Sequence, residues 1–265
     1  LETIFGQIPP NLLGQFLRNG PNPQFDLVGK AYHWFDGDGM VHGVRCDSGK
    51  AYYSNRWVRT KRFEHDRKLG PEGYIAEIGE SISAGVSAVM GKDPDVSAQQ
   101  NVGMRSRDPT TGERMGKANT ALLLHNGRFF ALEEGDAPYQ LSLPELATVG
   151  RHTFNKQLKH AFTAHPKVDP ITRELIFFGY GTRQPKVDFS LVNAKGDLVR
   201  TVDIKLRKSV MMHDCAITEN YTVVLDFPLY NAGLQFDETA ESRFGVMPRH
   251  AQSEDEVAWI SAPAA

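Results

Sequence analysis

The stretch that decides the fold is Val210-Met211-Met212-His213-Asp214-Cys215-Ala216-Ile217-Thr218, which is followed by Tyr221-Thr222-Val223-Val224-Leu225-Asp226. A second stretch, 48 residues earlier, has the same layout: His165 lies within His160–Pro170 and is followed by Leu175–Tyr180. Each stretch reads as a strand, a turn and an apolar, β-branched or aromatic return strand, with the histidine on the first strand. The sequence therefore predicts two equivalent β units.

The spacing of these units indicates the architecture. Units of several strands that repeat about every 40 to 50 residues are typical of a β-propeller. If His165 and His213 lie on the innermost strands of neighbouring blades, both imidazoles point at the central axis and make half of a metal site. A single histidine on a strand is more often a hydrogen-bonded core residue, but two at matched positions favour a metal. Zinc, copper, iron and nickel all accept imidazole, so the spacing leaves the metal open.

Turn signals divide the rest of the chain into hairpins. The four clearest are Asp47-Ser48-Gly49, Asn126-Gly127, Lys195-Gly196-Asp197 and Thr218-Glu219-Asn220, and Asn-Gly is the strongest signal for a two-residue hairpin loop. The crossover helices that a parallel sheet requires are not evident between the strands, which favours an all-β fold. One stretch, Ile75–Met90, breaks the pattern, because its apolar residues recur at helical three- and four-residue steps. We expect a helix there that packs on the β fold.

Composition excludes several function classes. The chain has 265 residues, a formal net charge of −2 and two cysteines, Cys46 and Cys215. This charge gives no electrostatic reason to expect a nucleic acid partner, and two distant cysteines fit a reducing compartment better than a disulfide scaffold. No apolar run approaches the roughly 20 residues that span a bilayer. No signal peptide is visible at the start, although a chain that begins so abruptly can have lost a targeting segment.

Taken in order, the motifs of this chain resemble those of the carotenoid cleavage dioxygenase family along nearly its whole length. The matching stretches are Arg18–Pro23, Tyr32–Gly43, Ala118–Ala121, Ala131–Glu134, Phe162–Pro170, Met211–Asp214 and Arg243–Val246. The resemblance implies a single domain over residues 1–265 with the family's seven-bladed β-propeller fold. About the first four blades would be present in this chain.

The resemblance also implies one Fe(II) on the propeller axis, held by four histidines, three of which are oriented by glutamates. His165 and His213 match the first two iron ligands, and Glu134 matches the glutamate that supports His213. The third ligand is expected shortly after Val257–Pro263, beyond Ala265, and the fourth lies further on. The chain alone is therefore expected to be inactive, poorly soluble or loosely folded, and incompletely loaded with iron.

The activity that the resemblance implies is that of a non-haem Fe(II) dioxygenase. Such an enzyme uses O₂ to cleave a conjugated double bond of a carotenoid or apocarotenoid into two carbonyl products. The aromatic residues near the histidines could line a tunnel for the polyene, although core packing accounts for most of them: Phe162, Phe177, Phe178 and Phe227. Residues 75–90 are expected to give peripheral membrane contact without spanning the bilayer. We expect the protein in the cytoplasm or in a plastid, either soluble or peripherally membrane-bound and not transmembrane.

A second interpretation belongs to another class of function. The chain would then be a truncated, catalytically inactive propeller that serves as a binding or structural module. Whether the coding region continues beyond Ala265 into a histidine-bearing strand distinguishes the two interpretations. A serine hydrolase is disfavoured because no Gly-x-Ser-x-Gly nucleophile motif is present, and phosphate-loop and dinucleotide motifs are absent as well.

Overall fold

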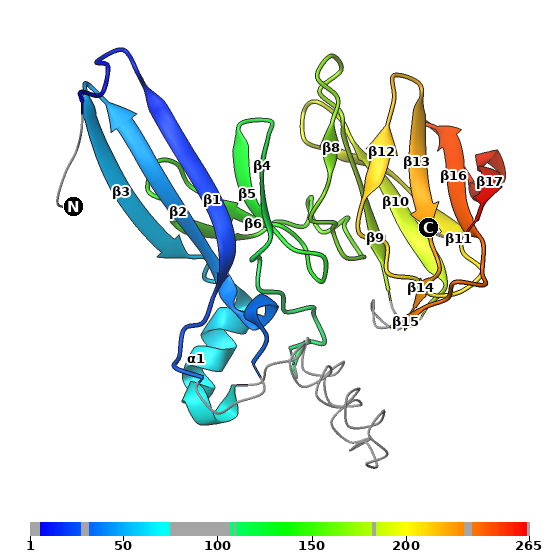
Figure 1. Ribbon diagram of the computed structural model, residues 1–265, viewed down its shortest axis with the longest axis horizontal. Helices are drawn as coiled ribbons and strands as arrows, with labels where there is room; N and C mark the ends of the chain where they lie inside the picture. The colour runs from blue at the N-terminus through cyan, green and yellow to red at the C-terminus, as the bar shows by residue number, and fades with distance from the viewer. Residues whose placement is uncertain are drawn as a thin grey trace. The chain divides into compact units, whose positions relative to one another are not determined.

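The computed structural model describes residues 6–27, 32–74, 107–108, 110–181, 184–230 and 235–263. These residues form mainly antiparallel strands (Figure 1). The chain divides into two compact units. The first consists of Leu1–Leu123, Phe129–Ala131 and Tyr139–Arg151, and the second of Leu124–Arg128, Leu132–Pro138 and His152–Ala265. The helix predicted at Ile75–Met90 lies outside the described residues, so that prediction stays open.

The first unit begins with a three-stranded antiparallel sheet in the order β1-β2-β3. Its strands are β1 (Gly14–Asn22), β2 (Asp38–Asp47) and β3 (Lys50–Trp57), and the short 3-10 helix η1 (Trp34–Asp36) precedes β2. Ser48 and Gly49 connect β2 to β3 with positive φ angles of 50° and 76°, the geometry of a tight hairpin turn. The hairpin predicted from Asp47-Ser48-Gly49 is confirmed.

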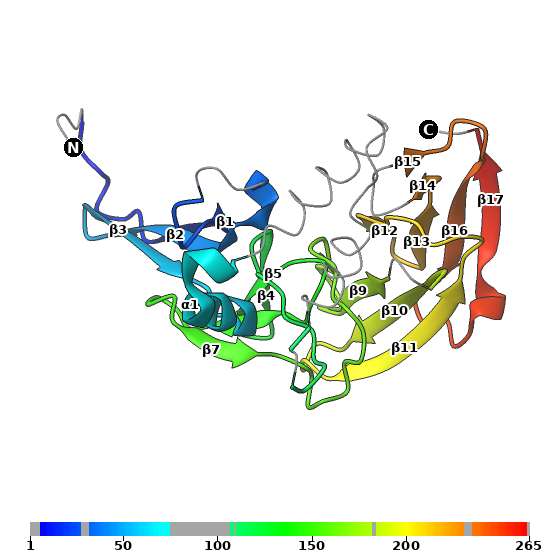
Figure 2. The same ribbon diagram turned by 90° about the horizontal axis from the view of Figure 1, so that it is seen from below.

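A charged helix, α1 (Lys61–Gly73), follows β3 and was not predicted from the sequence (Figure 2). It begins where the Thr60 hydroxyl accepts a hydrogen bond of 3.0 Å from the backbone N–H of Phe63, which caps the first turn. Its helical geometry is interrupted at Gly70, where φ is +71°, immediately before Pro71. Few apolar residues lie along this helix, so it carries little of the periodic signal that reveals a helix in a sequence.

A four-stranded sheet follows in the order β4-β5-β6-β7. Its strands are β4 (Ala121–His125), β5 (Arg128–Leu132), β6 (Tyr139–Leu141) and β7 (Thr148–Arg151). Asn126 and Gly127 both have positive φ angles, 48° and 68°, which confirms the predicted two-residue hairpin between β4 and β5. The core of the first unit contains buried side chains from both of its sheets, including Val41, Phe129 and Tyr139.

The second unit contains two further four-stranded antiparallel sheets, in the orders β11-β10-β9-β8 and β12-β13-β16-β17. The first consists of β8 (Lys167–Val168), β9 (Leu175–Tyr180), β10 (Lys186–Val192) and β11 (Leu198–Lys205). The second consists of β12 (Cys215–Ile217), β13 (Tyr221–Asp226), β16 (Ser242–Pro248) and β17 (Ala258–Ala262). A short hairpin of β14 (Leu229–Tyr230) and β15 (Gln235–Phe236) and the 3-10 helix η3 (Glu254–Glu256) complete the unit.

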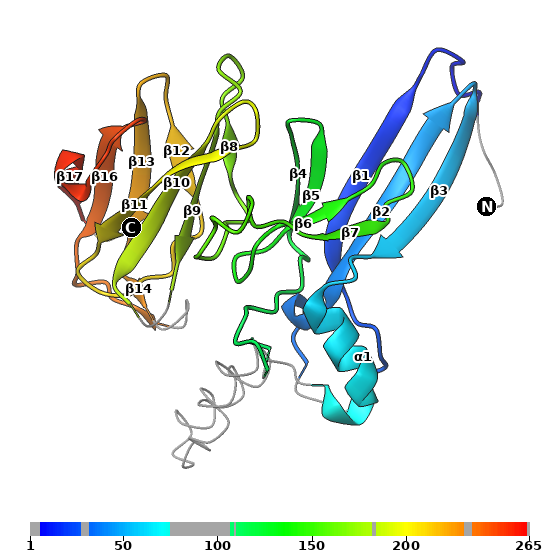
Figure 3. The same ribbon diagram turned by 180° about the vertical axis from the view of Figure 1, so that it is seen from behind.

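The two sheets of the second unit lie side by side in Figure 3. One continuous hydrophobic core joins them. Phe178, Phe189 and Ile204 from the first sheet pack with Val224 and Met247 from the second. The strand with the lowest number in each sheet, β8 or β12, lies at the sheet's edge and pairs with a long return strand. The two stretches that were matched in the sequence thus occupy equivalent places in two equivalent sheets. The all-β fold class is confirmed.

Within the described ranges, no helix is both long and apolar enough to cross a membrane.

Candidate metal centre

His165 and His213 occupy equivalent positions, each two residues before the edge strand of its sheet. His165 precedes β8 at Lys167, and His213 precedes β12 at Cys215. The prediction that each histidine lies on a strand is therefore wrong. For His165 the reason is local, because the Thr163 hydroxyl accepts a hydrogen bond of 3.0 Å from its backbone N–H. Such a side-chain bond satisfies a backbone group that would otherwise enter a ladder.

Backbone hydrogen bonds attach both histidine-bearing segments to the second unit. The N–H of Thr163 donates to the carbonyl of Phe178 at 2.9 Å, and the N–H of Met211 donates to that of Leu229 at 2.8 Å. Phe162 lies fully buried against Phe177, with ring centroids 4.1 Å apart. The two histidine side chains therefore extend from segments whose neighbours are fixed.

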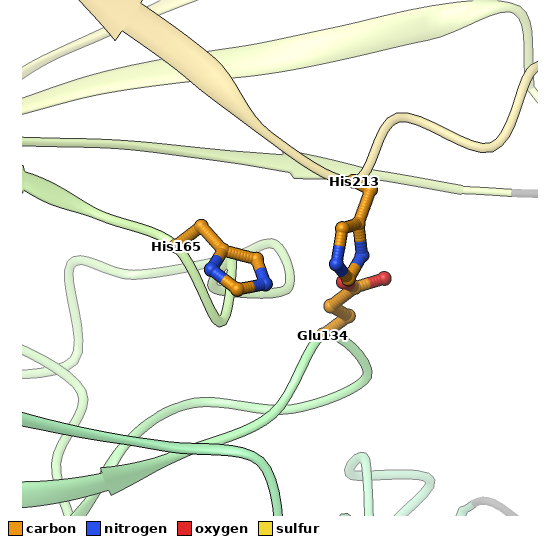
Figure 4. Close-up of side chains that lie close together, drawn as sticks. All are labelled: Glu134, His165 and His213. Atoms are coloured by element: carbon orange, nitrogen blue, oxygen red, sulfur yellow. The ribbon is translucent and has the colours of Figure 1, made fainter.

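Glu134 lies in the loop after β5 and contacts His213 directly (Figure 4). Its Oε1 is 2.5 Å from Nδ1 of His213. The same loop is attached near His165, because the carbonyl of Asp136 accepts a hydrogen bond of 2.9 Å from the N–H of Phe162. Glu134 itself lies outside the strand, because β5 ends at Leu132. The contact with His213 is the one that the resemblance implied.

Tyr180, at the end of β9, contacts the other oxygen of the same carboxylate. Its hydroxyl donates to Oε2 of Glu134 at 2.6 Å. Burial, together with the adjacent Glu134 carboxylate, raises the pKa of the Tyr180 phenol above its usual value. The phenol therefore stays protonated and remains a hydrogen-bond donor at physiological pH.

The side chains of Glu134, His165 and His213 converge closely enough to hold one metal ion. Their ligand atoms all lie within 4.8 Å of one another, and the two imidazole centroids are 4.4 Å apart at an interplanar angle of 63°. Nε2 of His165 is buried and has no hydrogen-bond partner among the described residues. Buried polar atoms in proteins are nearly always paired, so an orphaned one calls for an explanation such as a bound ion. Since Glu134 occupies Nδ1 of His213, its Nε2 is the nitrogen available to a metal, and the donor set fits one.

An ion pair joins the two histidine-bearing segments beside the site. Nζ of Lys167 lies 2.7 Å from Oδ1 of Asp214, and both side chains are partly exposed. Partial burial opposes ionisation of Asp214, but the Lys167 ammonium and the N–H of Cys215 outweigh it and hold the pKa of the carboxyl below its usual value. Because these residues follow His165 and His213 closely in the chain, the pair restrains the separation of the two histidines.

Three of the four aromatic residues considered for a substrate tunnel are core residues. Phe162, Phe177 and Phe178 are almost completely buried, and Phe178 belongs to the core that joins the two sheets. Phe227 is less buried and packs edge-on against Phe244, with centroids 5.4 Å apart. Core packing thus accounts for most of this set.

The hydrogen bond of Tyr180 with Glu134 was not predicted, and neither was the ion pair of Lys167 with Asp214. Tyr180 is separated from Glu134 by 46 residues, and the sequence carries no signal for a contact at that distance. For Lys167 and Asp214 a signal was available: opposite charges follow the two matched histidines by two residues and by one.

This chain is similar to known proteins along nearly its whole length. A family model described as retinal pigment epithelial membrane protein matches residues 1–265. Carotenoid 9,10(9',10')-cleavage dioxygenase 1 of Arabidopsis thaliana is 39% identical over 98% of this chain and 49% of its own length. The chain thus spans about half the length of the curated relatives that it matches.

Solved structures show the same fold. A lignostilbene dioxygenase of Pseudomonas brassicacearum superposes with a TM-score of 0.76 at 28% identity, over 98% of this chain and 52% of its own. A cobalt-substituted Synechocystis apocarotenoid oxygenase superposes with a TM-score of 0.69 at 23% identity, over 99% and 55%. These neighbours are seven-bladed propellers, and this chain covers about half of that fold. The chain belongs to the retinal pigment epithelial membrane protein family, which is also the family of the carotenoid cleavage dioxygenases.

Proposed function

We propose that the protein containing this chain is a non-haem iron(II) dioxygenase that cleaves a conjugated double bond of a carotenoid or apocarotenoid. The observation that carries the proposal is the convergence of His165 and His213 beside a carboxylate bound to Nδ1 of His213. Relatives named carotenoid 9,10(9',10')-cleavage dioxygenase and apocarotenoid oxygenase support the substrate class. Because the chain covers about half of these relatives, the proposal concerns the whole protein.

His165 and His213 would hold the iron through their Nε2 atoms. Neutral imidazole suits iron among other transition metals, and one structural neighbour, with a TM-score of 0.69, is a cobalt-substituted enzyme. When bound, iron(II) supplies the redox chemistry by which O₂ is used to convert one carbon–carbon double bond into two carbonyl groups. The chain's own residues set the conditions for that chemistry.

Glu134 would set the tautomer of His213. A carboxylate at Nδ1 holds the proton on that nitrogen and leaves Nε2 as a bare lone pair directed away from the loop. The same contact fixes the ring orientation, because the loop is attached through Asp136. Glu134 therefore contributes to metal affinity without being counted among the ligands.

Metal titration tests the two ligands. We expect anaerobic titration with Co²⁺ or Fe²⁺ to show strongly weakened binding in His165→Ala and in His213→Ala. The matched control is His42→Ala. The His42 ring contacts Tyr53 in the first unit, so its removal should leave metal binding unchanged. Equal metal content in the parent and in both site variants would contradict the metal site.

Product analysis tests the activity. We expect the full-length protein, expressed in bacteria that accumulate a carotenoid, to bleach the pigment and release aldehyde or ketone fragments detectable by mass spectrometry. Glu134→Gln should reduce metal affinity or turnover by about 10- to 100-fold, the usual effect of losing a partner that orients a metal-bound histidine. Unbleached pigment with a fully metal-loaded protein would contradict the carotenoid substrate while leaving the metal site intact.

A further inference from the structure

Both carboxylate oxygens of Glu134 make contacts. One contacts His213, a candidate metal ligand, and the other contacts Tyr180. Oε1 contacts Nδ1 of His213 at 2.5 Å, and Oε2 accepts the hydroxyl of Tyr180 at 2.6 Å. Among the described residues, the hydrogen bond of Tyr180 at this site goes to Glu134 and not to either histidine. Any influence of Tyr180 on the site therefore passes through the carboxylate.

Tyr180 is held more firmly than the Glu134 side chain that it contacts. Tyr180 is the last residue of β9 and pairs with Val187 of β10, and its ring packs against the core and near Phe178, with centroids 6.3 Å apart. Glu134 belongs to a loop outside any strand. A carboxylate on a loop has rotational freedom, whereas a phenol on a paired strand has little.

We propose that Tyr180 is a positioning residue for the metal site: its hydroxyl holds the Glu134 carboxylate in the orientation that keeps the proton of His213 on Nδ1 and leaves Nε2 bare. This inference rests on the proposed function, since it concerns a residue that supports Glu134 at the same site. Hydrogen bonds to ionised acceptors are short and about twice as strong as neutral ones, and both contacts of Glu134 are of that length. Loss of the phenol hydroxyl frees the carboxylate to rotate, and the tautomer of His213 is then less well defined.

The first experiment measures the tautomer in the metal-free full-length protein, where no metal chemistry is involved. Nitrogen-15 NMR of the imidazole, assigned by the loss of signals in His213→Ala, is expected to show His213 protonated at Nδ1 near pH 8. In Tyr180→Phe, which keeps the ring and removes only the hydroxyl, the share of the Nδ1 tautomer should fall. Tyr52→Phe is the matched control, because Tyr52 is exposed on β3 and far in sequence from Glu134, His165 and His213.

The second experiment measures Co²⁺ affinity in a double-mutant cycle. We expect Tyr180→Phe to weaken binding by about three- to tenfold, less than the roughly 10- to 100-fold expected for removing the direct partner with Glu134→Ala. Combining the two changes should weaken binding no more than Glu134→Ala alone, because Tyr180 acts only through Glu134. A change in core packing alone would instead add to the effect of Glu134→Ala.

The outcomes separate this inference from the proposed function. A shifted tautomer in a chain that binds no metal supports the role of Tyr180 and contradicts the metal site. Additive losses in the double mutant, or an unchanged tautomer in a Tyr180→Phe variant with the parent's thermal midpoint, overturn the inference. The parent alone also tests it: a His213 protonated at Nε2 would show that the contact does not set the tautomer, whatever the folding of the variant.

Discussion

Asp38→Asn is expected to stabilise the first unit at neutral and alkaline pH. Asp38 is completely buried at the start of β2, and its Oδ1 finds no hydrogen-bond donor among the described residues; Oδ2 accepts one bond of 3.2 Å from Gln24. The nearby charges that act on it are Asp66, Arg62 and Lys117. Burial raises the pKa of Asp38 to about 6, against a partial opposing effect of the Lys117 and Arg62 charges.

The magnitude follows from this shift. A rise from 3.8 to about 6 is about 2 units, and each unit corresponds to about 1.4 kcal/mol, so the ionised carboxylate destabilises the fold by about 3 kcal/mol. Because the folded pKa of Asp38 lies above the unfolded one, its contribution is most favourable below pH 4, is lost as the pH rises to about 6, and stays lost above that. The new amide N–H₂ lacks an acceptor and offsets about 1 kcal/mol, which leaves a gain of about 2 kcal/mol at pH 8.

Urea unfolding at pH 5 and pH 8 measures this gain. Tryptophan fluorescence in a Trp259→Phe background reports on the first unit, since the remaining Trp34 and Trp57 lie there. Trp57 packs against Phe63 of α1 with ring centroids 5.8 Å apart. The control is Asp47→Asn, at the end of β2, where the partly exposed carboxylate makes a 3.8 Å ion pair with Arg45 and accepts a hydrogen bond of 2.9 Å from the Ser48 hydroxyl. A difference between Asp38→Asn and the parent that is the same at both pH values would refute the reasoning.

Three further expectations concern the second unit. Lys167→Met should weaken Co²⁺ binding by about two- to fivefold, since the partly exposed pair with Asp214 is worth about 0.2–1 kcal/mol. Arg249→Met should clearly lower the urea midpoint, because this buried guanidinium pairs with Asp169 and Glu174. The imidazole of His152 should stay neutral in an NMR titration down to pH 5, because burial, followed by the Arg128 charge, lowers its pKa to about 4. The contribution of the neutral imidazole to stability is present above pH 6.5 and is lost as the pH falls towards 4.

Each of these expectations has a control or a contrary result. Lys195→Met, in a hairpin loop of the same unit, should not change metal affinity, and a loss equal to that of Lys167→Met would reject the role of the ion pair. A urea midpoint for Arg249→Met no lower than that of Lys205→Met, which breaks an exposed pair with Glu254, would show the buried cluster to be dispensable. An imidazole of His152 that titrates near pH 6.5 would reject the burial argument.

The strands of the second unit were largely predictable from the sequence. The return strands Leu175–Tyr180 and Tyr221–Asp226 have the predicted bounds, because uninterrupted β-branched and aromatic runs between turn residues leave few alternatives. The matched histidines also fall at equivalent places. The setting of His165 was not predictable, since the hydroxyl of Thr163 draws its backbone N–H out of the ladder, and a strand pattern does not show such competition.

The features that were not predicted depend on side-chain contacts that a sequence pattern does not show. Glu134 was placed by family resemblance, because a carboxylate after a hairpin is otherwise ordinary in a sequence. Tyr180 reads as the last aromatic residue of a buried strand, and only the folded chain shows its hydroxyl on Glu134. Helix α1 was missed because its stability depends on a cap at Thr60 and on the buried pair of Arg62 with Asp66, 2.6 Å apart, which leave no apolar periodicity.

Because the two histidines lie outside the strands, the ligands of the site can change without a change in the sheets. Each ring is borne by a connector that enters an edge strand of only two or three residues. Exchanging His165 or His213 for another ligand type removes no ladder hydrogen bond, because the bonds of these connectors are made by the backbone and by neighbouring side chains. Metal preference can therefore diverge among proteins of this architecture while the sheets stay the same. A carboxylate at either position is the substitution with which to begin such a redesign.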